Sequence, residues 1–63
     1  MSLLYDATNT ATAFCHTRDL LVEDALELAQ QIVGCMALEV EGDATERYVR
    51  DAWKRMEENH EQE

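Results

Sequence analysis

Positive charge and long apolar runs are both scarce in this chain. Its 63 residues include 5 lysine or arginine residues against 14 aspartate or glutamate residues, so the formal net charge is −9. This charge disfavours nonspecific binding to nucleic acid or to an anionic membrane surface, and it favours basic partners. No apolar run reaches the roughly 18 residues that suggest a transmembrane helix. The N-terminus has no basic region followed by an apolar block, so we expect no secretory signal, no membrane contact and a cytoplasmic protein.

The chain also has few residues suited to metal binding or catalysis. Its two cysteines are Cys15 and Cys35, and its two histidines are His16 and His60. Their spacing contains no CxxC or HxxxH pair, so it matches no zinc pattern. A disulfide is uncommon in a cytoplasmic protein. A catalytic cysteine and histidine must meet in space with a third group that orients the histidine, and adjacency in sequence does not supply this. We therefore predict a non-enzymatic protein with no catalytic residue, no metal and no cofactor, and leave open whether either thiol is reactive.

Residues 20–41 form the longest periodic segment. Their apolar side chains recur every three or four positions, which is typical of one face of an α-helix. No proline interrupts the segment, and Thr17 or Asp19 is placed to cap its start. Gly34 is its weak position and costs about 1 kcal/mol relative to alanine. The apolar face consists of Val22, Leu26, Ala29, Val33, Met36 and Val40.

A second helix is predicted over residues 44–59. Gly42 suits a turn after the first helix because glycine readily adopts the left-handed conformation found there. The apolar positions again recur every three or four residues. Residues 60–63 have nothing to bury, so we expect this tail to fray. The second apolar face consists of Tyr48, Val49, Ala52, Trp53 and Met56.

Residues 1–18 give a weaker signal. Residues 6–12 are rich in small and β-branched polar side chains, which is typical of a loop or a weak strand. Phe14 is the only phenylalanine, and we expect it to cover one end of the core. The sequence therefore predicts a short N-terminal arm or loop before the two helices.

These elements predict one small all-α domain, an antiparallel helical hairpin with a short N-terminal arm. A chain of this length buries little of its surface and often needs a partner subunit. Two helices cannot bury both apolar faces, so we predict a homodimer that forms a four-helix bundle. The candidate interface residues are Val22, Leu26, Ala29, Val33, Met36, Val49, Trp53 and Met56.

Two charged clusters have alternative interpretations. Glu23, Asp24 and Glu27 are either a solvated helix start, where acids suit the helix dipole, or a docking face for a basic partner. Arg47, Arg50 and Lys54 either pair with acids of their own helix, or contact phosphate or the acidic start of the first helix in a partner subunit. We predict a small acidic interaction or regulatory protein that binds a protein partner through its helix faces. The alternative is a nucleic-acid-binding regulator that uses Arg47, Arg50 and Lys54.

Residues 13–35 carry one resemblance. Their pattern is similar to that of a family of short pseudomonad proteins catalogued as a domain of unknown function. The match covers about a third of the chain; Asp19 stands where those proteins tend to have glycine, and the second helix does not match. The resemblance implies a small helical protein of bacterial origin and no activity. It is carried by Phe14, Leu20, Glu23, Asp24, Ala25, Leu26, Glu27, Ala29, Ile32, Val33, Gly34 and Cys35.

Overall fold

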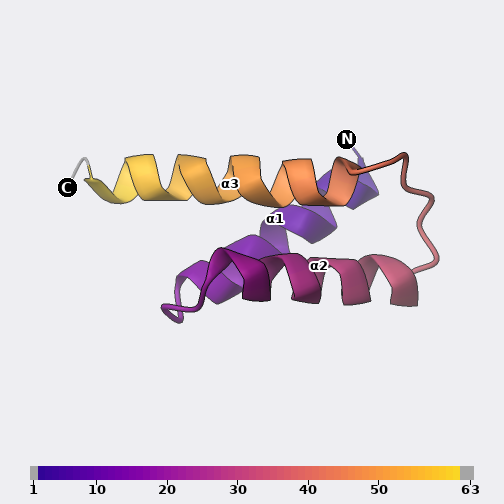
Figure 1. Cartoon of the computed structure of the whole chain (residues 1–63), viewed down its shortest axis with the longest axis horizontal. Coiled ribbons are helices and arrows are strands. Elements are labelled where there is room, and N and C mark those ends of the chain that lie inside the picture. Colours follow the sequence, from indigo (N-terminus) through magenta and orange to yellow (C-terminus); the bar gives the residue numbers. More distant parts are fainter. Residues whose placement is uncertain (1, 62–63) are drawn as a thin grey trace.

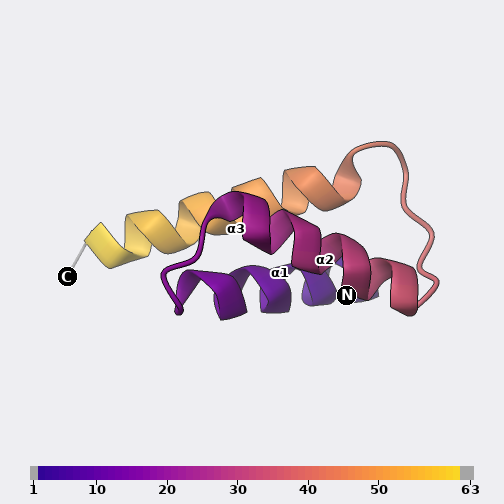
Figure 2. The same cartoon turned by 60° about the horizontal axis from the view of Figure 1, so that its bottom comes forward.

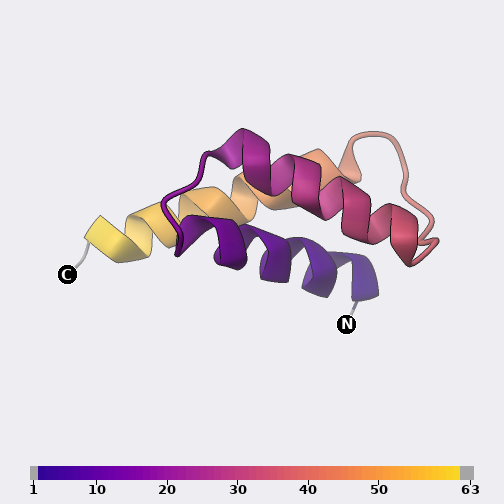
Figure 3. The ribbon, with the colours of Figure 1, turned by 90° about the horizontal axis from the view of Figure 1, so that it is seen from below.

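Three helices make up the fold. The computed structural model describes residues 2–61, with the side chains of residues 2–59, and in this part of the chain all regular structure is helical. The helices are α1 (Leu3–His16), α2 (Val22–Cys35) and α3 (Ala44–Glu61). Each helix contacts both others, and α2 runs opposite to α1 and α3 (Figure 1, Figure 2 and Figure 3). The all-α class predicted from the sequence is confirmed.

The N-terminal segment forms α1, so the predicted arm or loop over residues 1–18 is wrong for most of its length. Its threonines bury their hydroxyl groups by donating hydrogen bonds to the preceding helical turn. Thr8 Oγ1 donates to the carbonyl of Leu4 at 3.0 Å, and Thr12 Oγ1 donates to the carbonyl of Thr8 at 2.6 Å. Both threonines are fully buried, so here threonine packs as a small core residue rather than as a loop residue. Met1 lies outside the described residues.

Small side chains fill the centre of the fold. The fully buried positions of α1, α2 and α3 are mainly alanine, threonine and cysteine. Bulkier side chains such as Leu28 and Trp53 pack around them and stay partly exposed. Small side chains let helices approach closely, but they bury little apolar area per residue. We call this set the small-residue core; it consists of Thr8, Ala11, Thr12, Cys15, Ala25, Ala29, Val49 and Ala52.

Helix α2 is shorter than predicted. It ends at Cys35 rather than near residue 41, because Ala37 takes a left-handed conformation with a φ of 54°. The Ala37 N–H donates to the carbonyl of Gly34 and the Leu38 N–H to that of Val33, both at 3.1 Å. This pair of hydrogen bonds closes a Schellman motif and stops the helix.

The start of α2 also differs from the prediction. Asp19 has a φ of 57° and lies in the turn that follows α1. The Leu21 N–H donates instead to Asp24 Oδ2 at 3.0 Å, so an acid within the first turn satisfies this end of the helix.

Helix α3 begins at Ala44, as predicted, after a turn in which Gly42 has a φ of 53°. It continues to Glu61, two residues beyond the predicted end at residue 59, and residues 62–63 lie outside the described part. The fraying predicted for residues 60–63 stays a prediction. Arg55 of α3 donates from Nη1 to Tyr5 Oη and from Nη2 to Asn9 Oδ1, both at 3.1 Å. These two hydrogen bonds tie α1 to α3 across the fold.

Candidate protein-binding surface

Large apolar side chains are exposed where α1 turns into α2. Phe14 is 47% exposed, Leu20 41% and Leu21 66%. The turn points these leucines outward because Asp19 is left-handed and the Leu20 N–H donates back to the carbonyl of Cys15 at 3.1 Å. Because Phe14 is 47% exposed, it does not cover one end of the core as the sequence predicts. We call Phe14, Leu20 and Leu21 the turn surface.

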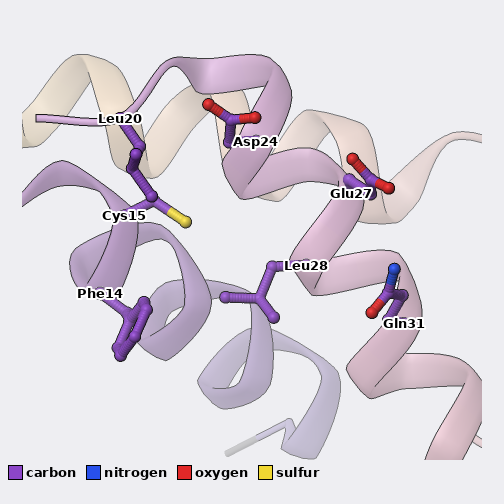
Figure 4. Close-up of a pocket in the computed structure, with 7 residues that line it drawn as sticks. All are labelled: Phe14, Cys15, Leu20, Asp24, Glu27, Leu28 and Gln31. Carbon is purple, nitrogen blue, oxygen red and sulfur yellow. The ribbon is translucent and has the colours of Figure 1, made fainter. Parts of the chain in front are cut away.

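A shallow groove of about 320 Å³ runs beside the turn surface between α1 and α2. Cys15 is buried at its base, and Leu28 reaches from α2 toward α1, as Figure 4 shows. The carboxylates of Asp24 and Glu27 stand along its α2 edge (Figure 4). We call this the α1–α2 groove; it is lined by Phe14, Cys15, Leu20, Asp24, Glu27, Leu28 and Gln31.

A second hollow lies on the other side of the turn, next to Trp53. The indole Nε1 of Trp53 donates to Glu57 Oε1 at 3.0 Å, and the ring of His16 meets the indole edge-on with centroids 4.9 Å apart. His16 Nε2 lies 3.9 Å from the same carboxylate oxygen. These contacts satisfy the polar edge of Trp53 within the chain and leave Leu20 and Leu21 on the wall of the hollow.

The predicted interface residues do not form one surface. Three of them, Ala29, Val33 and Val49, are buried inside the chain and cannot reach a partner in this conformation. The structure corrects the prediction there, because α1 covers the face that two helices alone would expose. Met36 is exposed at the end of α2, and the half-buried ones are Val22, Leu26, Trp53 and Met56.

The predicted acidic face divides between two roles. Glu23, Asp24 and Glu27 are all exposed on α2. Asp24 caps the helix through the Leu21 N–H, which fits the interpretation as a helix start. Asp24 and Glu27 also line the α1–α2 groove, where they make its edge negative.

The predicted basic positions lie on the exposed side of α3. Arg47 Nε lies 2.9 Å from Asp43 Oδ1, and Arg50 Nε lies 2.9 Å from Glu46 Oε2. Both guanidinium groups therefore pair with acids next to their own helical turn, as the intrahelical interpretation predicts. Lys54 is exposed.

The two cysteines differ in environment, and both are free thiols. Burial raises the pKa of the Cys15 thiol, as does the nearby charge of Asp24, and the positive charge of Arg18 opposes this. Cys35 is exposed at the end of α2.

We expect a thiol reagent to modify the native protein in two phases, because thiolate is the reactive form and Cys15 is shielded and harder to ionise. A Cys35→Ser variant should lose the fast phase, and a Cys15→Ser variant should keep it. Absorbance of the released chromophore measures both rates. Equal rates for the two thiols in the native state would contradict this environment for Cys15.

Among residues 2–59, whose side chains are described, no group of three or more histidine, cysteine, aspartate or glutamate residues is placed to hold a metal ion. None of the helices described here has both the length and the apolar character to cross a membrane. No protein-family model, curated protein or solved structure matches this chain. The resemblance of residues 13–35 to a pseudomonad family therefore stays a prediction.

Proposed function

We propose that this protein is a non-enzymatic interaction module that binds a protein partner through the turn surface. The observation that carries the proposal is the exposure of Phe14, Leu20 and Leu21 around one turn, on a chain whose core is built mainly from alanine, threonine and cysteine. Exposed apolar side chains that gather in one place, with polar groups around them, are characteristic of protein-binding surfaces.

The setting of the turn surface supports this proposal. A hollow lies on each side of it, one beside α2 and one beside Trp53. Leu20 lines both hollows, so a partner seated on the turn could fill both and exclude water from the leucines. Anchors that fill adjoining hollows supply most of the binding energy in protein interfaces.

A paired capture experiment tests the proposal. The tagged wild-type protein and a Leu20→Gln/Leu21→Gln variant are expressed in the source cells and recovered with their bound proteins. We expect a protein that the wild type retains and the double variant loses. A Leu3→Gln/Met36→Gln variant is the matched control, since it removes two exposed apolar side chains away from the turn. Identical protein sets from the wild type and the turn variant would refute the proposal.

We also propose the homodimer predicted from the sequence, as a contact separate from the turn surface. Because α1 already packs against α2 and α3, two copies would have to meet through the parts of α2 and α3 that α1 leaves uncovered, using the exposed edges of the half-buried Val22, Leu26, Trp53 and Met56. Each copy carries a formal charge of −9, so added salt should strengthen self-association by screening the repulsion. Sedimentation velocity at low and high salt measures this effect. A single monomeric species at every protein concentration, at both low and high salt, would refute the homodimer and leave the protein partner as the remaining proposal.

A further inference from the structure

The α1–α2 groove combines an apolar interior with one acidic edge. Leu20, Leu28 and the ring of Phe14 supply the apolar walls, and the buried Cys15 closes the base. Such a hollow favours an anchor residue on a partner rather than a polar ligand.

The edge formed by α2 sets the charge of the partner. Asp24 and Glu27 are three residues apart, so they lie on neighbouring turns of the same helix face. Glu27 is exposed, and Asp24 uses Oδ2 to accept the Leu21 N–H. The charge of Asp24 also reaches the groove base, where it helps to raise the pKa of the Cys15 thiol. An incoming acidic segment would be repelled here, and lysine or arginine would be attracted.

The wall of the groove already accepts a cation from this chain. The guanidinium carbon of Arg18 lies 3.6 Å from the ring centroid of Phe14. Arg18 Nη1 also donates to the carbonyl of Phe14 at 3.2 Å, which holds the guanidinium in place. A cation stacked on an aromatic ring contributes about 0.5–1 kcal/mol at an exposed site. Arg18 therefore places a positive charge beside Phe14, opposite in sign to the acidic edge that Asp24 and Glu27 form on α2.

We propose that the α1–α2 groove binds an amphipathic helix of a partner protein, with an apolar side chain placed between Phe14 and Leu28. A lysine or arginine on the next turn of that helix contacts Asp24 and Glu27. The inference rests on the proposed function and adds the chemistry of the partner. A helix fits because it presents an apolar side chain and a cation on adjacent turns of one face, as the groove presents apolar walls beside an acidic edge.

A second copy of this chain is a poorer occupant of the groove. The arginines of α3 are already engaged: Arg47 pairs with Asp43 and Arg50 with Glu46, each at 2.9 Å, and Arg55 pairs with Asp51 at 3.3 Å. Lys54 is the remaining cation of this helix and is exposed. Two copies would also bring together two chains of charge −9. Charge complementarity therefore favours a basic partner over self-association at this site.

Calorimetric titration with two designed peptides tests this inference. One is a helical peptide with leucines on one face and lysines beside them, and the other has glutamate in place of each lysine. We expect the lysine peptide to bind, more weakly as salt is raised, and the glutamate peptide not to bind. Glu27→Lys should weaken binding by about tenfold or more, which corresponds to loss of a close charge pair and its replacement by repulsion.

Glu39→Lys is the matched control. It makes the same change in net charge at an exposed position in the loop between α2 and α3, and we expect it to leave the affinity nearly unchanged. Equal weakening by Glu27→Lys and Glu39→Lys would mean that overall charge attracts the peptide, and would overturn the inference. Failure of the lysine peptide to bind would overturn it as well. Self-association that is lost in the Glu27→Lys variant would assign the groove to a second copy instead. None of these results decides the proposed function, which the capture experiment with the turn variant tests separately.

Discussion

Replacing Ala11 with leucine should lower the free energy of unfolding by about 1–3 kcal/mol, and more if the helices cannot move apart. Ala11 is 1% exposed and lies in α1 at the centre of the small-residue core. A leucine there must enter a space already filled by α2 and α3. A domain of this size has a total stability of roughly 3–9 kcal/mol, so the variant should lose a large part of it.

Thr10→Leu is the control for this variant. Thr10 is the preceding residue of α1 and is exposed, so the same new side chain should change the stability little. Urea denaturation followed by circular dichroism measures both variants. If both tolerate leucine equally, α1 is not packed as the structure has it, and the arm predicted from the sequence would be the better description.

Replacing Val49 with alanine should cost about 2 kcal/mol, because it removes buried methyl groups and leaves a cavity. Val49 is the largest fully buried side chain in the described part of the chain. It lies in α3 within the small-residue core. Its alanine neighbours have little side chain with which to fill the space, so we expect most of the cavity to persist.

Val40→Ala provides the comparison for Val49→Ala. Val40 is half-buried in the loop between α2 and α3, so the same truncation there should cost much less. Denaturation followed by the fluorescence of Trp53 gives both values. A loss of stability at residue 40 that equals or exceeds the loss at residue 49 would show that the core is centred elsewhere.

Helix periodicity predicted α2 and α3 because their apolar residues are leucine, valine and other large side chains. It missed α1 because there the core face is made of Thr8, Ala11, Thr12 and Cys15, and threonine counts as a polar loop residue in such a pattern. Their spacing of three and four positions was present in the sequence. What the sequence did not reveal is that the threonine hydroxyls are satisfied within the helix.

The sequence indicates only part of the candidate site, again because it does not reveal α1. The acidic residues Asp24 and Glu27 were recognised as a possible docking face, and both line the α1–α2 groove. Leu20 and Leu21 were assigned to the start of a helix, although they lie in the turn before α2. Their exposure depends on where α1 ends, and that boundary could not be placed without recognising α1. Helix α1 therefore determines both which residues form the core and which apolar side chains are exposed at the turn.

The small-residue core links the fold to the proposed function. Alanine, threonine and cysteine occupy the centre, while bulky side chains such as Phe14 and Leu21 lie on the surface. The same packing of α1 against α2 creates the groove beside them.

Native-state hydrogen exchange by NMR tests the packing of α1 most directly. We predict that the backbone amides of residues 11–15 in α1 exchange slowly, at rates similar to residues 29–33 in α2 and 49–52 in α3, because all three groups open only when the core opens. Fast exchange in α1, at the rate of an unstructured chain, with protection confined to α2 and α3, would contradict the three-helix core and remove the groove that depends on it.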